Sequence, residues 1–452
     1  MSQTLDAMAE LTGSGVFTLA VFAAAVIAWM TGKMDDTFVG LSAAALLVFG
    51  GIVSSEAFFG ALGSETIWLL IAAFVLAAAL TRTGLPTRFA IALCGKASSV
   101  RGLAHRITAA LVITSLAVPA TSGRAALALP VFLALAAALA DRAAVVRALA
   151  LLFPTVILLS AVATITGAGA HLVTSQLLQQ STGHGIGYAQ WLLLGFPFAV
   201  VSSHLAAEVV LLVMTRSDDR RRPLELHGLA GHVDVTTDGP LTAAQLRAVA
   251  ALTFVVTLWC TEPWHGLSPA LVALFGALVT TAPRVGLTRL PEALSTVPWS
   301  LLLFMVTTAV LGIALSSSGA ADWLGHTLLS PAGGGLAFLV VVVVVSAAAH
   351  LVLQSRSARS SVLIPLLIPL ATAAGLDPVA VAFASTVAAG FCHTLPSSAK
   401  PVAMFAAVTE APTYRRSDLL RISLYLGPLT VGLVLTFALA VWPALGLPLQ
   451  AP

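Results

Sequence analysis

The chain has 452 residues, of which 58% are hydrophobic and only 9% are charged, and its mean hydropathy is +0.99. A soluble domain has about 25% charged residues, so this composition excludes a soluble globular protein and indicates an integral membrane protein in a lipid bilayer. The formal net charge of +3 says little about partners, and we expect no nucleic-acid partner for a membrane protein. Cys94, Cys260 and Cys392 fit no disulfide or metal-binding spacing, so we expect neither a metal nor a cofactor.

Apolar segments occur along the whole chain, and those of about 18 residues or more are long enough to cross a bilayer core of about 30 Å. The segments cover residues 15–32, 37–55, 67–82, 107–141, 148–182, 190–215, 248–262, 266–283, 299–316, 335–374, 378–409 and 422–446. Polar residues, glycine or proline interrupt four of them, at 120–124, 166–170, 354–359 and 395–401. The long hydrophilic stretch 216–247 lacks helical periodicity and is typical of a loop between two halves.

The positions of Lys and Arg predict a topology. We take 107–141 and 335–374 as re-entrant hairpins and the broken segments 148–182 and 378–409 as single crossings. All 22 Lys and Arg residues then lie on one face, except those in the interruptions, which are Arg124, Arg356, Arg359 and Lys400. The positive-inside rule makes this face cytoplasmic and places both termini outside. Two full crossings in place of the first hairpin would leave the other segments unchanged but would put Arg124 outside.

The two halves of the chain repeat. Gly84, Ser122 and Pro130 recur at a constant spacing in the second half, as Gly319, Ser357 and Pro365. In the predicted topology the first copy starts at the cytoplasmic face and the second at the outer face. Repeats of opposite orientation with broken helices are typical of secondary transporters, whose substrate site lies near the bilayer midplane. We therefore expect an all-α polytopic membrane protein with inverted structural repeats, each containing a re-entrant helical hairpin and a broken transmembrane helix.

This interpretation divides the chain into five parts. They are an N-terminal transmembrane helix at 1–35, repeat 1 at 36–215, a cytoplasmic loop at 216–247, repeat 2 at 248–421 and a C-terminal transmembrane helix at 422–452.

The arginines in the interruptions need compensation, because an arginine at the centre of a membrane helix costs about 2.5–3.5 kcal/mol on insertion scales. No carboxylate lies in the segments around Arg124 and Arg359. The simplest counter-charge is an anionic substrate, whose oxygen atoms a guanidinium binds in a bidentate manner. Amides at the N-termini of the following half-helices would add partial positive charge. The alternative is snorkelling or a structural pair with a distant acid such as Glu208.

The candidate substrate-binding residues lie in the four interruptions. They are Thr121, Ser122, Gly123, Arg124, Thr166, Gly167, Ser355, Arg356, Ser357, Ala358, Arg359, Ser397, Ser398 and Lys400. Ser122 and Ser357 are alternatively caps of the half-helices that follow them. Each of His171, His350 and His393 is either a proton relay or a buried packing residue. The sequence contains no hydrolase motif, so a membrane-embedded enzyme has little support.

These segments resemble the divalent anion–sodium symporter family of the ion transporter superfamily. Hairpins of that family carry a Ser-Asn-Thr tip and a small-residue run into Leu-Pro, and "ATSGRAALALP" and "SRSARSSVLIP" occupy those places here. Its broken crossings carry Gly-Thr-Pro-Pro-Asn-like turns, where this chain has "TGAGAHLV" and "LPSSAKPVAMF". The similarity covers roughly residues 36–446. It implies an elevator-like mechanism and a homodimer that carries C4-dicarboxylates, citrate or sulfate. It also implies that scaffold helices lie within about 15–82 and 248–316.

Departures from the family pattern concern the residues that hold sodium and substrate in relatives. Arg124 and Arg359 replace a threonine of each hairpin, and Ala168, His171, Ala399 and Val402 replace Thr and Asn of the turns. We hypothesise that the two arginines substitute for the charge of sodium. We therefore expect a sodium-independent secondary transporter of small divalent anions in the inner membrane, working by anion exchange or, second, proton coupling. A sulfate or sulfonate carrier is the alternative, whereas a cation/proton antiporter would need an acidic residue near the interruptions.

Overall fold

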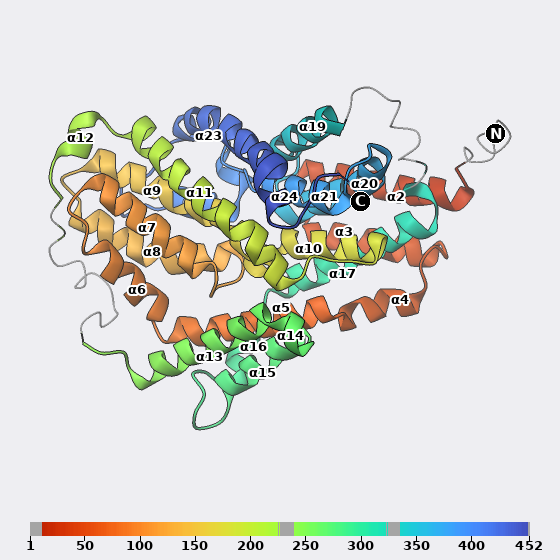
Figure 1. Cartoon of the computed structure of the whole chain (residues 1–452), viewed down its shortest axis with the longest axis horizontal. Coiled ribbons are helices and arrows are strands. Elements are labelled where there is room, and N and C mark those ends of the chain that lie inside the picture. Colours follow the sequence, from red (N-terminus) through yellow and green to blue (C-terminus); the bar gives the residue numbers. More distant parts are fainter. Residues whose placement is uncertain (1–10, 225, 227–238, 322, 324–334, 451–452) are drawn as a thin grey trace.

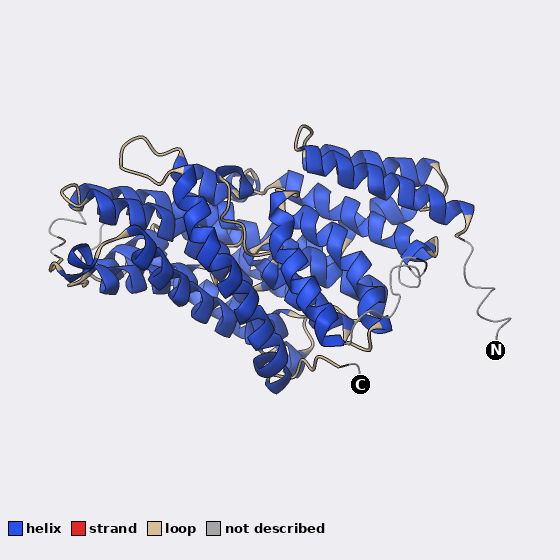
Figure 2. Ribbon diagram, turned by 90° about the horizontal axis from the view of Figure 1, so that it is seen from above, coloured by secondary structure: helices blue, strands red, loops and turns tan. Residues whose placement is uncertain are grey.

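The fold is taken from a computed structural model of the chain, in which residues 11–224, 226, 239–321, 323 and 335–450 are described. Within these ranges the chain forms helices joined by loops, as Figure 2 shows. Eight of the described helices are long and apolar enough to cross a membrane. The prediction of an all-α, multi-pass membrane protein is therefore confirmed. Of the hydrophilic stretch 216–247, predicted as a loop, residues 225 and 227–238 lie outside the described residues. Its described part contains a short helix at Ser217–Arg221 and the start of a longer helix at Ala243, so it is not loop throughout.

The helices follow one another in the order shown in Figure 1. The longer ones are α2 (Gly13–Thr31), α3 (Asp36–Phe49), α5 (Glu65–Arg82), α6 (Leu85–Cys94), α7 (Val100–Thr114), α8 (Thr121–Ala138), α9 (Ala143–Leu159), α10 (Gly169–Thr182), α11 (Tyr188–Met214), α13 (Ala243–Cys260), α15 (Pro269–Thr281), α17 (Trp299–Ser317), α19 (Gly335–Ala348), α20 (Arg356–Ala373), α21 (Pro378–Ala388) and α23 (Arg416–Thr436). Short helices are α4 (Ser55–Gly60), α12 (Ser217–Arg221), α14 (Glu262–His265), α16 (Leu290–Leu294), α22 (Lys400–Ala406) and α24 (Trp442–Ala444).

The spacing that separates Ser122 from Ser357 recurs in the helix boundaries. Both ends of α8 are separated from the corresponding ends of α20 by this same spacing, and so are the first residues of α9 and α21. The first residues of the hairpin arms α7 and α19 show it as well. Corresponding segments of the two halves therefore adopt the same local structure.

The hairpin helices begin closer to the tips than the sequence indicated. We expected unwound chain at 120–124 and 354–359, but α8 starts at Thr121 and α20 at Arg356. The hydroxyl of Ser355 caps α20 by accepting a hydrogen bond from the amide of Ala358 at 3.3 Å. Capping by Ser357 is therefore wrong, because that residue lies inside the helix. No side chain caps the N-terminus of α8.

The broken helices unwind earlier than the sequence indicated. Helix α9 ends at Leu159 and is followed by short 3₁₀ turns up to Gly167. Helix α21 ends at Ala388, and an irregular segment with a 3₁₀ turn at Pro396–Ser398 leads to α22. Close packing explains the first break, because a Cβ atom on Gly167 would lie 2.0 Å from the carbonyl oxygen of Ala161. Only glycine fits this approach.

The two halves of the chain are interleaved rather than separate. Helix α10 of the first half packs against α20 of the second, and α22 of the second half packs against α8 and α9 of the first. Helices α3 and α17 pack together, as do α5 and α15, so each of these pairs also joins the two halves (Figure 1). This interleaving brings the four interruptions to the middle of the molecule.

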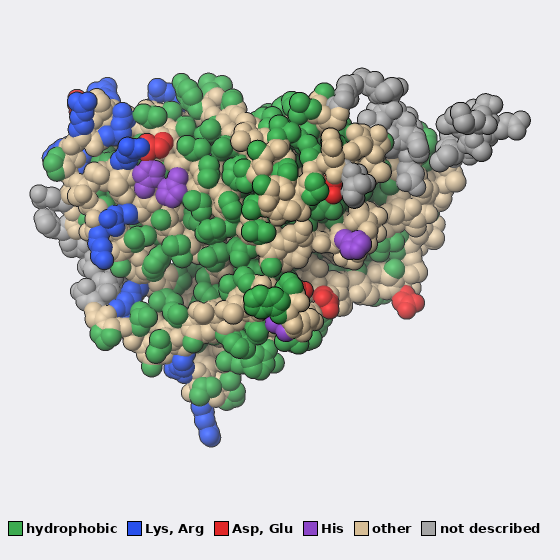
Figure 3. All heavy atoms as spheres, viewed as in Figure 1, with side chains coloured by type: hydrophobic (Ala, Val, Ile, Leu, Met, Phe, Trp, Pro, Cys, Tyr) green, Lys and Arg blue, Asp and Glu red, His purple; other side chains and the backbone are tan. Residues whose placement is uncertain are grey.

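Charged side chains are distributed unevenly over the surface. In Figure 3, Lys and Arg gather at the end of the molecule that carries α12, whereas the middle of the visible face is mainly hydrophobic. A mainly hydrophobic middle is the surface expected for a protein surrounded by lipid.

Candidate functional site

A cavity of about 370 Å³ lies where the four interruptions meet, and we call it the central cavity. Both hairpin tips and both breaks line it, together with the first residues of α3 and the start of α17. Its lining residues are Asp35, Asp36, Thr37, Ala120, Thr121, Ser122, Ala168, Gly169, Pro298, Ser300, Leu301, Phe304, Gln354, Ser355, Arg356, Ser357, Ser398, Ala399 and Lys400. Segments from both halves of the sequence therefore share one site.

Half of the expected binding residues line the central cavity. They are Thr121, Ser122, Ser355, Arg356, Ser357, Ser398 and Lys400. Gly123 lines a neighbouring cavity of about 510 Å³ between α5 and α8. Ala358 is buried in an apolar cluster with α2 and α3. The side chain of Ser397 lies outside the described part of the structure.

Thr166 and Gly167 lie in the first break, next to residues that line the central cavity. The carbonyl oxygen of Thr166 accepts a hydrogen bond from the amide of Ala120 at 3.3 Å, which ties the first hairpin tip to the first break. Neither residue is among those that line the central cavity. We therefore assign these two residues a positioning role.

Four of the longer helices begin at the central cavity. The first residues of α3, α8, α10 and α20 all belong to its lining. Free amides and the helix dipole give each of these ends partial positive charge, which favours a bound anion. Helices α10 and α20 meet here with close contact, because a Cβ atom on Gly169 would lie 2.9 Å from Oγ of Ser357.

Arg356 is the guanidinium that lines the central cavity. Its Nε and Nη1 atoms are buried and have no hydrogen-bond partner among the described residues. Lys400, at the start of α22, adds a second, more exposed cation. Neither residue belongs to an ion pair within the described ranges. Two positive charges are therefore available to a ligand in this cavity.

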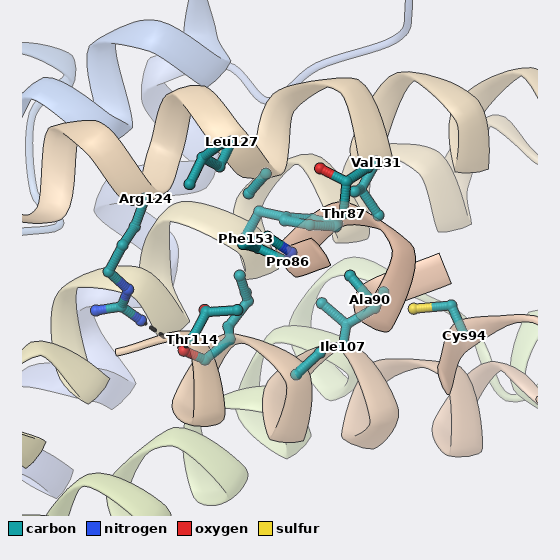
Figure 4. Close-up of a pocket in the computed structure, with 13 residues that line it drawn as sticks. Pro86, Thr87, Ala90, Cys94, Ile107, Thr114, Arg124, Leu127, Val131 and Phe153 are labelled. Carbon is teal, nitrogen blue, oxygen red and sulfur yellow. Dashed lines mark hydrogen bonds between the residues drawn. The ribbon is translucent and has the colours of Figure 1, made fainter. Parts of the chain in front are cut away.

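Arg124 lies outside the central cavity, contrary to the expectation that it faces the substrate. Its side chain is 1% exposed. Nη2 donates to the carbonyl oxygen of Leu111 at 2.7 Å and to Oγ of Ser160 at 2.6 Å, and Nη1 donates to the carbonyl oxygen of Ile157 at 3.1 Å. Figure 4 shows the side chain extending from α8 at the end of a small apolar cavity of about 30 Å³. In this structure Arg124 joins the first hairpin to α9.

Arg359 occupies the corresponding place in the second half and also lies outside the central cavity. It is fully buried, and its Nη1 donates to the carbonyl oxygens of Ala389 at 2.9 Å and Phe391 at 3.4 Å. Both acceptors lie directly after the last residue of α21. Each of the two repeated arginines therefore binds the chain at the point where the first half of a broken helix ends.

The three histidines are buried and do not line the central cavity. His171 donates to the carbonyl oxygen of Thr164 at 3.0 Å and stacks on Trp191 at a centroid distance of 5.0 Å. His350 is hydrogen-bonded to the carbonyl oxygen of Ala347 and the hydroxyl of Thr394, both at 2.7 Å. His393 accepts from the amide of Cys392 at 3.3 Å. These contacts favour the packing alternative over a proton relay.

Sequence reasoning missed the two aspartates of the cavity. Asp35 and Asp36 precede an apolar segment, so they resemble an ordinary charged turn with a helix cap. The structure brings this turn to the second hairpin, where Gly32 lies near the side chain of Gln354. No local signal could have shown this proximity, because the two segments belong to different halves of the chain.

Replacing Ala120 by glycine is expected to stabilise the protein. Ala120 has φ 61° and ψ 138°, a region that costs a residue with a Cβ atom about 1–3 kcal/mol. Glycine loses about 0.4–1 kcal/mol through the greater entropy of the unfolded chain, so a net gain of ~1 kcal/mol remains. The thermal unfolding midpoint of the purified variant in detergent, compared with that of the natural protein, measures this gain in stability.

Ala168→Gly is the matched control, because Ala168 also precedes a helix in the cavity but has an extended φ of −154°. We expect its unfolding midpoint to fall slightly. Equal decreases in the two variants would show that Ala120 is not strained.

Comparisons with known proteins agree with a transport site. Residues 5–447 match the family described as the sodium:sulfate symporter transmembrane region. A membrane protein of Cupriavidus necator is 26% identical in an alignment 466 residues long, which covers 96% of this chain and 89% of that protein. The sodium-dependent dicarboxylate transporter SdcS of Staphylococcus aureus is 24% identical over 422 residues, which cover 87% of this chain and 80% of that protein.

Two solved transporter structures share the fold. Neisseria gonorrhoeae MtrF has a TM-score of 0.62 at 14% identity, covering 100% of this chain and 99% of its own. The Alcanivorax borkumensis YdaH transporter has a TM-score of 0.57 at 18% identity, covering 88% and 89%. At these identities the likeness concerns the fold alone.

Proposed function

We propose that this chain, which belongs to the sodium:sulfate symporter family, is a secondary transporter of small dicarboxylate-like dianions. Its family and its structural neighbours are transporters, so it is a membrane transporter of anions rather than an enzyme. The observation that carries the choice of site is Arg356, whose buried Nε and Nη1 have no partner among the described residues at the central cavity. A guanidinium with free donors is the group that binds a carboxylate best.

The size and lining of the central cavity favour an organic dianion over an inorganic one. Its volume of about 370 Å³ lies within the range of sites for small organic molecules, about 300–1,000 Å³. Hydroxyls of Thr121, Ser122 and Ser357 are available from both hairpin tips. Two carboxylates of a C4 acid could then engage Arg356 and Lys400 separately, whereas a single sulfate would leave most of the lining unused.

The position of Arg124 and Arg359 supports sodium-independent transport. In transporters with broken helices, sodium is coordinated by unwound carbonyls and by the C-terminal ends of half-helices. Arg124 donates to a carbonyl in the last turn of α9, and Arg359 to carbonyls directly after α21. A helix C-terminus carries partial negative charge, which the guanidinium neutralises as a bound cation would. Each arginine thus occupies a place suited to sodium.

Uptake that does not depend on sodium is therefore expected. Proteoliposomes containing the purified protein and internal unlabelled malate should take up labelled malate at the same rate in sodium and in choline medium. The fixed guanidinium groups supply the positive charge that sodium brings elsewhere. Uptake that occurs only with sodium would contradict this proposal, and proteoliposomes without protein give the background.

Finer features of the transporter belong to the same proposal. We favour anion exchange over proton coupling, because the three histidines are bonded or packed away from the central cavity. The cavity between α5 and α8, which shares Ala120, Ser122 and Pro298 with the central cavity, suits an access path on one side. Location in the inner membrane with both termini outside, elevator-like movement and a homodimer remain proposals that rest on the basic residues and on family resemblance.

A further inference from the structure

The central cavity contains a carboxylate that an ordinary dianion site would not need. Asp35 and Asp36 both line it, but their charges are used differently. Oδ1 of Asp35 accepts hydrogen bonds from the amides of Thr37 and Phe38, each at 3.0 Å, so this carboxylate caps α3. Asp36 makes no capping contact. Its half-buried carboxylate lies beside the hydroxyl of Ser355, and Lys400 is a cation in its surroundings.

The opposite charges of the cavity do not neutralise each other. The ion pairs found among the described residues are Arg82–Glu292, Arg101–Glu208, His105–Glu208 and Arg222–Asp141, and none of them involves the cavity. Asp36, Arg356 and Lys400 therefore line one small space without direct pairing. Arg356 has buried donors without a partner among the described residues, whereas Asp36 is half-buried and Lys400 is exposed. Buried charge is costly unless a partner compensates it, and a ligand that carries both signs would pair with all three groups.

A plain dicarboxylate would satisfy only part of this arrangement. Its two carboxylates could meet Arg356 and Lys400, but Asp36 would then repel them, because like charges at close range are destabilising. An ammonium group on the same ligand would reverse the sign of that interaction. It would also offer three N–H donors to Asp36 and to the hydroxyl oxygens of Ser355 and Ser357.

We propose that the transported anion carries one ammonium group in addition to two acidic groups, and that Asp36 recognises the ammonium. The inference rests on the proposed function, because it assigns the acidic groups to Arg356 and Lys400. It makes Asp36 the residue that determines specificity among diacids of similar size. The chemical class is an amino-substituted diacid with a net charge of −1.

Three C4 acids with the same carbon skeleton separate this inference from the proposed function. Succinate, L-malate and L-aspartate differ only in the substituent on one carbon, which is hydrogen, hydroxyl or ammonium. We expect the full-length protein in detergent to bind L-aspartate about tenfold more tightly than L-malate, measured by isothermal titration. Tenfold corresponds to about 1.4 kcal/mol, the size expected for one desolvated charge contact.

Asp36→Asn is the decisive variant, and Asp35→Asn is its matched control. Asparagine keeps the size of either side chain, and at position 35 it is as good a helix cap as aspartate. We expect Asp36→Asn to lose the preference for L-aspartate while still binding L-malate, and retained malate binding shows that the variant is folded. Asp35→Asn should keep the preference of the natural protein.

Each other outcome counts against a defined statement. If L-malate and succinate bind and L-aspartate has no advantage, the ammonium inference is wrong and the proposed function stands. The same conclusion follows if Asp36→Asn keeps the tenfold preference. If none of the three acids binds, the proposed function fails, and the inference that rests on it fails with it.

Discussion

Replacing Arg356 by glutamine is expected to reduce the affinity for a transported dianion about thirtyfold or more. The natural side chain has two buried nitrogen atoms, Nε and Nη1, with no partner among the described residues, at the edge of the central cavity. Loss of one member of a buried, hydrogen-bonded charge pair costs about 2–5 kcal/mol, and every 1.4 kcal/mol is a factor of about ten in affinity. Isothermal titration with the best ligand of a small-anion panel measures the effect.

The unfolding midpoint of the empty Arg356→Gln protein should change little. In the natural protein, Nε and Nη1 of Arg356 have no hydrogen-bond partner among the described residues, so the fold loses no contact of these atoms when the guanidinium is removed. Arg101→Gln is a suitable control on α7, because Arg101 is exposed and paired with Glu208 far from the cavity lining. Undiminished affinity in Arg356→Gln would show that the ligand is held elsewhere.

Replacing Arg124 by methionine should destabilise the protein by ~3 kcal/mol, because methionine keeps an unbranched side chain but removes the donors to Leu111, Ile157 and Ser160. A hydrogen bond to a charged group contributes about 1.5–3 kcal/mol, so the loss of three exceeds the relief from no longer burying a charge. Thermal unfolding of the ligand-free protein in detergent tests this expectation.

The same experiment decides between the two roles of Arg124. A substrate ligand would lose affinity without loss of stability, whereas a residue that joins α8 to α9 would lose stability first. Arg101→Met removes an arginine that is 69% exposed, so its effect should stay within about 1 kcal/mol. If Arg124→Met unfolds at the same temperature as this control and binds ligand weakly, Arg124 is a substrate ligand, as the sequence predicts.

The sequence did not show which way the side chains of Arg124 and Arg359 point. We expected Arg124 at an unwound tip, but α8 already begins at Thr121. Arg124 lies one helical turn after Thr121, and its side chain donates to the carbonyl oxygens of Leu111 and Ile157 instead of lining the cavity. Arg359 likewise lies one turn after Arg356 and donates to the carbonyl oxygens of Ala389 and Phe391. The backbone acceptors that the two side chains reach come from other segments of the chain, which no local pattern shows.

The broken helices show a similar limit. Glycines at 167 and 169 correctly marked the first break, but α9 already ends at Leu159. Beyond that end, Gly167 packs closely against the carbonyl oxygen of Ala161. The second break likewise begins directly after Ala388, in a sequence that is still apolar. Apolar composition shows that a segment is buried in the membrane, but it does not show where its hydrogen-bond ladder stops.

The sequence by itself determined the membrane location, the all-α fold and the resemblance to divalent anion–sodium symporters. The family match confirms this resemblance. These features depend on local composition and on short motifs. Only the tertiary structure decided which side chains share the cavity. Arg356 and Lys400 come from one half of the chain, Thr121 and Ser122 from the other, and Asp36 from a turn that resembles a simple cap. Their meeting results from the interleaving of α10 with α20 and of α22 with α8 and α9, and such long-range packing leaves no pattern in any local stretch of sequence.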